Sequence, residues 1–541
     1  MTEPTPAARA AVPSWMGALA GSSAAAVALG FSQFIEASTD IPGLVLGIGE
    51  LVIDYTPGWA AEESIENLGS AGKGNLLRGI TLVSFLIAAV LGDLSTRRTL
   101  RIGGAGFVAF GLLGGWATAR NPQSPAIGSW FWASVATGLG IATLFFLVNR
   151  ARATVAVPTP ADDEPPLERD VLASPLEPPA SRRAFLGYSA GAGAVALTSV
   201  GLGRAVQGPS AAETAREAIT LPSTSAPATT TTPSGEVSAT AFTDIEGLSS
   251  WITPSTQNNF YRIDTALQIP QVDPADWKLS ITGMVDRPFE LTYDEILDMD
   301  LVEHTITLSC VSNPVGGDLV GNAVWTGVPV IDLLDRAGVQ EGATQLVGRS
   351  VDDFTAGFPT DVLYDGRNAL LVVGMNGEPL PIRHGFPVRL VIAGLYGYVS
   401  ATKWLEGIHL TTWESFNGYW INLGWSKDGP MKTMSRIDVP RHRAQVEAGP
   451  TPIAGVAWAP LRGISAVEVS IDEDEWQACD LAVPGTDESW VQWRTEWDAT
   501  VGIHHIDVRA YDGDGDLQPV GPKDVAPDGA EGWHAIIVDV V

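Results

Sequence analysis

A single cysteine, Cys310, stands where an apolar run ends and a glycine-rich loop begins, in the stretch HTITLSCVSNPVGG. The chain has one other cysteine, Cys479, and two cysteines cannot form a disulfide framework. The Cys310 thiol could be a metal ligand in a Cys/His cluster, a nucleophile paired with His304 or His384, or an inert buried group. It could also be one ligand of a metal whose other ligands belong to an organic cofactor. No CxxC or Cys/His cluster surrounds Cys310, which weakens the first of these uses.

A metal held largely by a cofactor requires cationic and polar groups elsewhere in the chain. Three stretches supply them: NNFYRID (Asn258–Asp264), RHGFPVRL (Arg383–Leu390) and SATKW (Ser400–Trp404). Arg and Lys suit a phosphate, and Arg can bind it through two N–H groups at once. Taken singly, these residues also fit a core histidine, a solvated strand end or a surface lysine, so only their combination indicates a cofactor site.

Two globular regions must position these groups. Residues 242–434 mix strand-like runs such as ALLVVGM with helical runs such as PVIDLLDRAG, which predicts an α+β domain. Residues 435–541 consist of short alternating runs at the spacing of a β-sandwich, and we expect an Ig-like sandwich there. The stretch YDGDGD lacks the downstream Glu of a calcium loop and is predicted to be a hairpin turn.

Residues 1–150 are rich in Ala, Gly, Leu and Val and predict a multi-helix membrane domain. Its apolar segments lie near Trp15–Ile35, Ile41–Ile53, Ile80–Leu91, Gly103–Thr118 and Ile127–Val148. Arginines between the third and fourth segments and after the fifth indicate the cytoplasmic side, so the N-terminus is predicted to start outside. Glu50 and Asp54 share one helix face; they either form a quinone or proton site or lie at the membrane interface.

The two halves are joined by three further segments. Residues 151–180 form a Pro-rich acidic linker on the cytoplasmic side, and residues 205–241 form a flexible linker. Between them, residues 181–204 begin with Arg182–Arg183 before a weakly apolar stretch, which is typical of a twin-arginine export signal or of a sixth helix. Either interpretation places the later residues outside the cytoplasm, on a multi-pass protein of the cell membrane.

The charge and the histidines limit the partners. The net charge of -30 argues against nucleic acid. All seven histidines follow residue 303, so the membrane segments cannot supply the paired histidines of a membrane haem, and no CxxCH motif is present for a c-type haem. We therefore expect a separate electron-transfer partner, either a protein or a quinone.

Four stretches resemble, in order, the sulfite oxidase family of molybdopterin enzymes. These are NNFYRIDTALQIPQVDPADWKLSITG, LSCVSNPVGGDLVGNAVWTGVPVIDLL, MNGEPLPIRHGFPVRLVIAGLYGYVSATKWL and the C-terminal sandwich. The resemblance implies two-electron oxygen-atom transfer on a small substrate by a molybdenum–molybdopterin cofactor. It also implies a homodimer through the sandwich, which in this family is a dimerisation domain.

The resemblance assigns roles to eight residues. Cys310 is the implied thiolate ligand of molybdenum, and Arg262 is the implied catalytic arginine that attracts an anionic substrate near the metal. The implied cofactor-binding set comprises Asn258, Tyr261, Arg262, Cys310, Asn313, His384, Arg389 and Lys403.

Two departures from the family pattern bear on the substrate. Sulfite oxidases carry an arginine after the Cys-x-x-Asn motif, where this chain has Pro314–Val315, and an active-site tyrosine where it has Phe354. The substrate is therefore either a small oxo-anion or a sulfoxide-like molecule, the latter reduced as by sulfoxide reductases of the same superfamily. Two other classes are a non-enzymatic membrane-anchored scaffold and a ligand-sensing transporter. The scaffold does not explain Cys310 with His384, Arg389 and Lys403, and the scarcity of intramembrane charge beyond Glu50 and Asp54 argues against the transporter.

Overall fold

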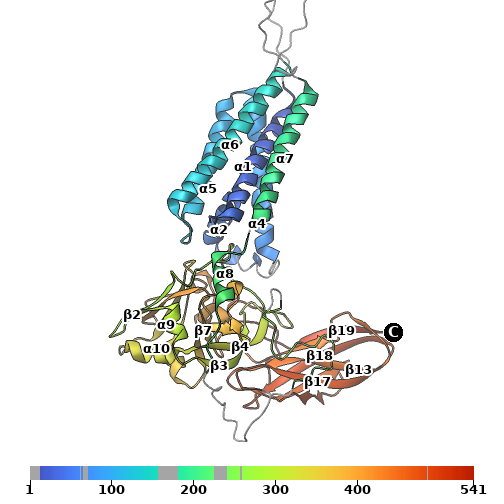
Figure 1. The fold of residues 1–541 in the computed structure, drawn as a ribbon. Helices are drawn as coiled ribbons and strands as arrows, with labels where there is room; N and C mark the ends of the chain where they lie inside the picture. Colours follow the sequence, from blue (N-terminus) through green and yellow to red (C-terminus); the bar gives the residue numbers. More distant parts are fainter. Residues whose placement is uncertain are drawn as a thin grey trace, which may run out of the picture. The chain divides into compact units, whose positions relative to one another are not determined.

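The computed structural model describes residues 12–39, 41–60, 63–64, 71–155, 181–206, 208–224, 241–255, 259–483 and 485–541. The chain falls into two compact units, which are described separately. Met1–Thr56 and Ser70–Gly208 form the helical unit; Pro57–Gly69 and Pro209–Val541 form the second unit. This confirms a helical N-terminal region followed by a β-rich region (Figure 1).

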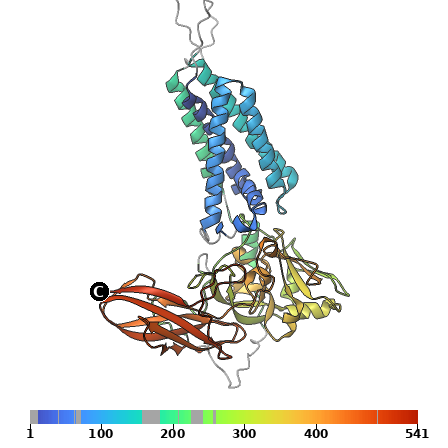
Figure 2. The ribbon, with the colours of Figure 1, turned by 180° about the vertical axis from the view of Figure 1, so that it is seen from behind.

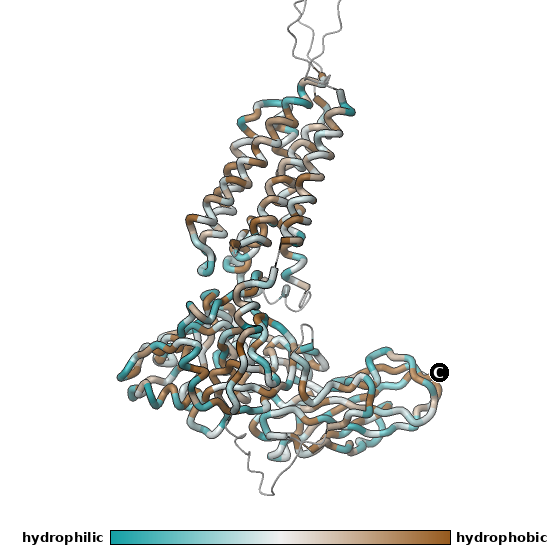
Figure 3. Tube along the Cα trace, in the orientation of Figure 1, coloured by the Kyte–Doolittle hydropathy of each residue, from teal (hydrophilic) through white to brown (hydrophobic). Residues whose placement is uncertain are grey.

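The helical unit contains five long apolar helices among the described residues, together with the short helix α2. They are α1 (Ser14–Ser38), α2 (Leu44–Asp54), α4 (Gly72–Arg97), α5 (Leu100–Ala119), α6 (Ala126–Ala153) and α7 (Arg182–Val206). Five stretches are long and apolar enough to cross a membrane: α1, α4, α5, α6 and Arg182–Ala218, which includes α7. Figure 3 shows the apolar residues running along these helices. Small residues let α1 and α4 touch, since a Cβ on Gly21 would lie 1.8 Å from the Ala88 carbonyl oxygen.

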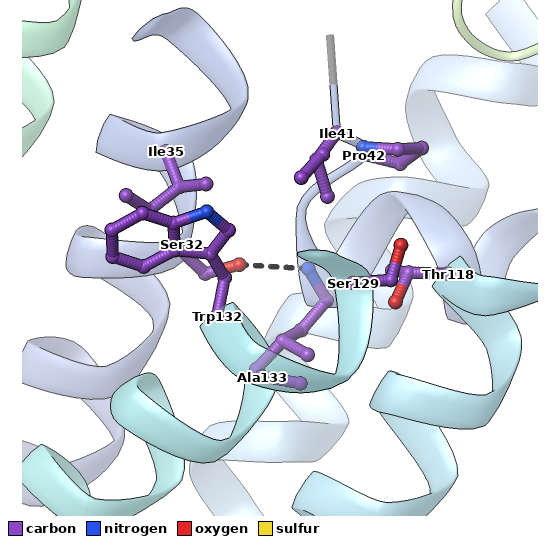
Figure 4. Close-up of a pocket in the computed structure, with 9 residues that line it drawn as sticks. Ser32, Ile35, Ile41, Pro42, Thr118, Ser129, Trp132 and Ala133 are labelled. Carbon is purple, nitrogen blue, oxygen red and sulfur yellow. Dashed lines mark hydrogen bonds between the residues drawn. The ribbon is translucent and has the colours of Figure 1, made fainter. Parts of the chain in front are cut away.

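The second predicted membrane segment, Ile41–Ile53, does not form a span. Its helix α2 has 11 residues, too few to cross a bilayer. The start of α2 is held by α1, because Ser32 Oγ accepts from Leu44 N–H at 2.8 Å and Glu36 Oε2 accepts from Gly43 N–H at 3.1 Å. A small pocket lies beside this corner, with Thr118 and Ser129 on its other side (Figure 4).

The short α2 also changes the predicted direction in which α1 runs through the bundle. Ser14 at the start of α1 accepts a hydrogen bond from Arg97 at the end of α4, and the Trp15 ring contacts Phe185 at the start of α7. The first turn of α1 therefore lies at the arginine-rich end of the bundle. The prediction that the first apolar segment starts at the end opposite the arginines is wrong, because it counted Ile41–Ile53 as a crossing.

Glu50 and Asp54 lie in the second half of α2, near the end of α5. Asn121 Nδ2 donates to both carboxylate oxygens of Glu50 at 3.2 Å, and Arg120 donates to the Tyr55 hydroxyl at 3.2 Å. These carboxylates thus share a polar cluster at helix ends, which favours the interfacial interpretation over a site within a span.

In the second unit, two sheets surround one large apolar core. The first has the strand order β2-β1-β10-β5-β6, and the second has the order β3-β4-β7-β8 with β9 beside β7. Their strands are β1 (Lys278–Gly283), β2 (Phe289–Thr292), β3 (Val302–Ser309), β4 (Val320–Pro329), β5 (Gln345–Ser350), β6 (Thr355–Pro359), β7 (Ala369–Met375), β8 (Glu378–Pro379), β9 (Arg389–Ile392) and β10 (Leu405–Thr411). β7 is buried at every position and reads as one apolar run, as expected of a central strand.

Short helical elements connect these strands or precede them. They are α8 (Ala211–Ala218), α9 (Tyr293–Leu297), α10 (Val330–Ala337), η2 (Thr360–Tyr364), η3 (Ile382–His384), α11 (Gly397–Ser400) and η4 (Ile421–Leu423). Thr292 caps α9 in a capping box with Glu295, and Gly338 ends α10 with a positive φ of 69°. Both devices are local, so the turns around the core follow from the sequence.

Two further sheets form the C-terminal region (red to orange in Figure 2). One has the order β11-β13-β17-β16 and the other the order β12-β19-β18-β14-β15. Their strands are β11 (Met434–Val439), β12 (Gln445–Val446), β13 (Gly449–Trp458), β14 (Ile464–Ile471), β15 (Gln477–Ala478), β16 (Asp480–Leu481), β17 (Val491–Ala499), β18 (Gly502–Asp512) and β19 (His534–Val540). Side chains from both sheets, including Ile453, Trp493, Val467 and Val508, share one core. An immunoglobulin-like topology stays a prediction.

The C-terminal region also reaches the strand that precedes Cys310. The Thr307 N–H in β3 donates to the Glu488 carbonyl at 2.9 Å, and the Trp490 N–H donates to Thr307 Oγ1 at 2.8 Å. Val525 and Ala530 are buried in the large core of the first two sheets. The position of β3 therefore depends on both parts of the second unit.

Candidate active site

Cys310 is the first residue of the loop between β3 and β4. The two strands pair antiparallel up to Ser309 and Val320, and the Cys310 N–H then donates to the Leu319 carbonyl at 2.9 Å. The residue is 8% exposed. The strand pairing therefore delivers a buried thiol at the mouth of a short loop, with its backbone fixed.

Asn313 holds this loop together. Its buried side chain accepts the Leu319 N–H through Oδ1 at 2.9 Å, and its own N–H donates to the Cys310 carbonyl at 3.1 Å. The predicted cofactor residue thus has a clear role in shaping the loop around Cys310. A contact between the Asn313 amide nitrogen and the cofactor stays a prediction.

Charged and polar groups surround the thiol. Cys310 Sγ lies 2.9 Å from Ser312 Oγ. Burial raises the pKa of Cys310, whereas the Ser312 hydrogen bonds and the positive charge of Lys403 lower it. Burial also raises the pKa of Tyr261, which interacts electrostatically with both Cys310 and Arg389. Tyr261 and Lys403 therefore lie near the thiol, as predicted.

Arg389 is a buried cation at the start of β9. Its Nη1 donates to the His384 carbonyl at 3.0 Å, and its guanidinium lies 5.1 Å from the centre of the Trp325 ring. Burial lowers the pKa of Arg389 to about 10, which still leaves it charged at neutral pH. Among the residues that the structure describes, no carboxylate forms an ion pair with it. A buried charge of this kind is stable only beside an anion or strong acceptors.

His384, in η3, carries an unused hydrogen-bonding atom. The side chain is 1% exposed, and Nε2 has no hydrogen-bond partner in the described part of the chain. Burial and the nearby cations, Arg389 first, lower the pKa of His384 to about 3, so the imidazole is neutral. The Phe260 ring packs edge-on against it at 5.6 Å. A buried polar atom without a partner points to a ligand that is bound there.

Lys403 and Arg262 share one carboxylate, which the sequence interpretation did not assign. Lys403 Nζ lies 2.9 Å from Asp264 Oδ2, and Arg262 Nε lies 3.7 Å from the same oxygen. The Asp264 side chain is 5% exposed, whereas that of Arg262 is 34% exposed. Asp264 lies inside the quoted stretch NNFYRID, and an acid two residues after Arg262 was the signal for this pairing.

The structure therefore brings together seven of the eight predicted residues: Cys310, Asn313, Tyr261, Arg262, His384, Arg389 and Lys403. Asn258 lies outside the described residues. Phe354 packs against the Tyr419 ring, with the ring centres 5.9 Å apart, so a phenol that the sequence comparison did not consider lies beside it.

This residue set fits a molybdenum–molybdopterin group. No group of three His, Cys, Asp or Glu residues in the described ranges could hold a metal by itself, so a metal at Cys310 needs ligands from another molecule. The buried guanidinium of Arg389 and the ammonium of Lys403 suit a phosphate. The unpaired Nε2 of His384 offers a hydrogen bond to a polar heterocycle.

Comparisons with known proteins agree with this fit. The family model of the oxidoreductase molybdopterin binding domain matches residues 266–420. The uncharacterized oxidoreductase YuiH of Bacillus subtilis (strain 168) is 34% identical over 157 residues, which cover 29% of this chain and 76% of that protein.

Two longer matches extend beyond the family model. Mitochondrial sulfite oxidase of Macaca fascicularis is 27% identical over 345 residues, 54% of this chain and 62% of that protein. The NADH nitrate reductase of Spinacia oleracea is 28% identical over 315 residues, 46% of this chain. The chain spans about a third of the length of that nitrate reductase, 34%. From these matches and the residue set around Cys310, the chain belongs to the sulfite-oxidase-like family of molybdopterin oxidoreductases, and its cofactor is molybdenum–molybdopterin.

Proposed function

We propose that this protein is a membrane-anchored oxidoreductase that performs two-electron oxygen-atom transfer on a small substrate outside the cytoplasm. The observation that carries the proposal is the convergence of one buried thiol, Cys310, with a buried Arg389 and an unpaired His384 Nε2. A scaffold protein has no reason to bury a guanidinium without a carboxylate partner, and an imidazole nitrogen without a hydrogen bond, among the described residues.

The residues divide the work of holding the cofactor. Cys310 provides the protein thiolate for the metal, Arg389 and Lys403 neutralise the phosphate, and His384 donates or accepts one hydrogen bond through Nε2. When bound, the molybdenum–molybdopterin group supplies the two-electron redox chemistry and the exchange of an oxygen atom with the substrate. The chain fixes the position of that group and excludes water from its protein side, because Cys310, His384 and Arg389 are all buried.

Arg262 is the cation that is available to the substrate. Its side chain is 34% exposed, whereas that of Lys403 is 11% exposed. An exposed guanidinium near the metal orients a polar oxygen of the substrate through a charge-assisted hydrogen bond. We therefore assign substrate orientation to Arg262 and cofactor binding to Lys403.

The substrate is either a small oxo-anion or a neutral oxo-compound such as a sulfoxide. The neutral compound is the second candidate, and three features support it. Asp264 lies close to both Arg262 and Lys403 and offsets part of their charge. The loop after Cys310 carries Pro314–Val315 in place of an arginine, and Phe354 offers no hydroxyl group.

The helical unit supports the proposed location. Arginines gather at the ends of α4 and α6 and at the starts of α5 and α7: Arg97, Arg98, Arg101, Arg150, Arg152, Arg182 and Arg183. By the excess of positive charge on cytoplasmic loops, this end faces the cytoplasm. α7 starts there, and one crossing leads the residues after it to the outer side. A separate protein or quinone as electron partner, and a homodimer through the C-terminal region, remain part of the proposal.

The test is to purify the full-length chain from a host that makes the cofactor and to supply artificial electron donors and acceptors. Oxidation of sulfite and reduction of dimethyl sulfoxide are measured side by side, together with molybdenum per chain. Turnover of either substrate with about one molybdenum per chain supports the proposal. A folded protein that contains molybdenum but moves no oxygen atom to or from any small oxo-compound contradicts it.

A further inference from the structure

The loop that carries Cys310 is only partly held by its own residues. Asn313 ties the loop to Leu319, and the Gly317 N–H donates to the Pro314 carbonyl at 2.9 Å. In the outer part, from Pro314 to Gly317, Val315 packs against the large core, and Gly316 and Gly317 contact side chains of the C-terminal region. Those contacts therefore bear on where Cys310 lies.

Arg436, in β11, makes the first of these contacts. Its Nη1 donates to the Gly317 carbonyl at 2.8 Å, its Nε donates to Asp438 Oδ1 at 2.7 Å, and its Nη2 donates to Ser249 Oγ at 2.9 Å. The residue is 8% exposed. All three nitrogens of a planar group are engaged, so the guanidinium has one orientation, and the Gly317 carbonyl is held at a fixed place.

His534, the first residue of β19, makes the second contact. Gly316 adopts a φ of +73° beside the imidazole, and a Cβ at that position would lie 2.3 Å from His534 Nε2. His534 Nδ1 accepts the Ile437 N–H at 3.0 Å. A ring nitrogen that accepts a hydrogen bond is unprotonated, so the other nitrogen, Nε2, carries the proton. Gly316 is thus required both by its backbone angle and by the ring that it touches.

The charge of the imidazole agrees with this geometry. Burial and the positive charge of Arg436 lower the pKa of His534 to about 4. The ring is therefore neutral at physiological pH and keeps its acceptor for Ile437. Arg436 and His534 act on neighbouring residues, Gly317 and Gly316, and together hold the outer half of the loop against β11 and β19.

We propose that Arg436 and His534 are positioning residues for Cys310, through which the C-terminal region sets the direction of the thiolate toward the metal. The inference rests on the proposed function, since it concerns the same site. It adds that the C-terminal region, expected from sequence only to mediate dimerisation, forms part of the active-site scaffold. A loop fixed at Asn313 and at Gly316–Gly317 leaves the thiol little freedom, which is what a rigid metal site requires.

The alternative is that Arg436 only links two parts of the second unit through hydrogen bonds and has no effect on the site. Loss of such a purely structural residue lowers stability but leaves the metal environment unchanged. Loss of a positioning residue changes the environment of the metal in molecules that remain folded. The electron paramagnetic resonance signal of the molybdenum separates the two, because it responds to the angle and distance of the thiolate sulfur.

The experiment compares full-length, cofactor-loaded wild type with Arg436→Met, Arg436→Lys and Gly316→Ala. Arg509→Met is the matched control, since Arg509 in β18 pairs with Glu468 in β14 at 2.6 Å. Molybdenum per chain, the resonance signal and the thermal midpoint are measured for each. We expect Arg436→Met and Gly316→Ala to shift the signal, with molybdenum retention lower by about 10-fold, as for other outer partners of metal ligands.

Arg436→Lys keeps a donor for the Gly317 carbonyl and should return most of the wild-type signal. Arg509→Met should match wild type in signal and in molybdenum. If Arg436→Met does not fold, Gly316→Ala decides, because it removes no charge or hydrogen bond. Unchanged signals and molybdenum in folded Arg436→Met or Gly316→Ala would overturn the inference. Wild type without molybdenum would instead overturn the proposed function itself.

Discussion

Two regions of the second unit each hold one cysteine and one key histidine, in opposite electrostatic surroundings. In the candidate site, Cys310 lies near the cation Lys403 and shares a hydrogen bond with the Ser312 hydroxyl. On the C-terminal region, Cys479 lies next to Asp480 and Glu468, and burial with these carboxylates raises its pKa to about 12. Cys310 is buried and Cys479 is half-buried, and burial raises the pKa of both thiols, so burial does not favour Cys310 as the thiolate. The neighbouring charge decides which one can serve as a thiolate.

The histidines show the same contrast. His384 is surrounded by arginines and a lysine and stays neutral. His504 lies between two acceptors, with Nδ1 2.6 Å from Asp472 Oδ2 and Nε2 2.7 Å from the Thr500 carbonyl. Both nitrogens must donate, which raises the pKa of His504. The candidate site is therefore suited to bind an anion, whereas the C-terminal region already contains carboxylates beside its cysteine and histidine.

The largest expected effect separates the two cysteines. Cys310→Ser removes the protein thiolate, so activity should fall by more than about 100-fold. Loss of a residue that only hydrogen-bonds to a metal ligand costs up to about 100-fold. Cys479→Ser is the matched control and should retain both molybdenum and activity. Molybdenum content and turnover of purified full-length protein check this pair. Equal activity in the two variants would remove Cys310 from the metal site.

The second effect tests the buried cation. Arg389→Met should weaken cofactor retention by about 30-fold or more, since removing one partner of a buried charge pair costs about 2 kcal/mol or more. Arg494, whose side chain is 38% exposed and pairs with Asp244, provides the control Arg494→Met. Pterin fluorescence after extensive dialysis measures retention. Retention that is the same in both variants would show that Arg389 does not hold the phosphate.

The third effect is a pH dependence on the C-terminal region. The pKa of His504 in the folded protein is raised above its ordinary value of 6.5. Its contribution to stability is thus complete below about pH 6.5 and is lost as the pH rises through the folded pKa. His504→Asn should destabilise the β14–β18 pair by about 0.5 kcal/mol at pH 5.5, because such partly exposed pairs are weak, and by less at pH 9.

Hydrogen–deuterium exchange measures this effect locally, with wild type and variant compared at each pH. The His505 N–H, which donates to Asp472 Oδ1 at 2.8 Å, is the amide to follow. A difference between the two proteins that grows with pH would have the wrong sign and would exclude a charged His504.

The smallest effect concerns the reactivity of Cys479. Asp480→Asn removes one of the negative charges that raise the pKa of this thiol, so its thiolate fraction and its alkylation rate at pH 9 should rise by about threefold. The rise is modest because burial, the largest cause of the shift, remains. Mass spectrometry of the alkylated peptide gives the rate. A slower rate in Asp480→Asn would contradict the assigned electrostatics.

Sequence reasoning found most of the candidate site because its residues lie in short, recognisable stretches. Cys310, His384, Arg389 and Lys403 each follow or begin a predicted element, and the strands bring them together. The partners Arg436 and His534 could not be predicted, because Arg436 meets Gly317 across 119 positions through the packing of separate sheets. The shared carboxylate of Asp264 was visible in the sequence, but its distance to two cations was not.

The helical unit shows the limit of composition as a guide. Ile41–Ile53 is as apolar as a crossing segment, yet α2 begins at Leu44 and ends at Asp54. A hydropathy profile contains no information on the hydrogen bonds that Ser32 and Glu36 of α1 accept from the N–H groups at the start of α2. These bonds fix the start of α2 against α1. Because the prediction counted one crossing too many, it placed the start of α1 at the wrong end of the bundle.

The contact between Gly316 and His534 also sets an order of events during synthesis. A ribosome makes His534 about 220 residues after Cys310, so at about 5–20 residues per second the loop waits roughly 10–45 s for its last support. Until then the thiol lies in an unfinished loop. Metal loading would accordingly favour chains that have completed β19, and a ribosome that stalls before this strand would release a product that fails to keep the metal.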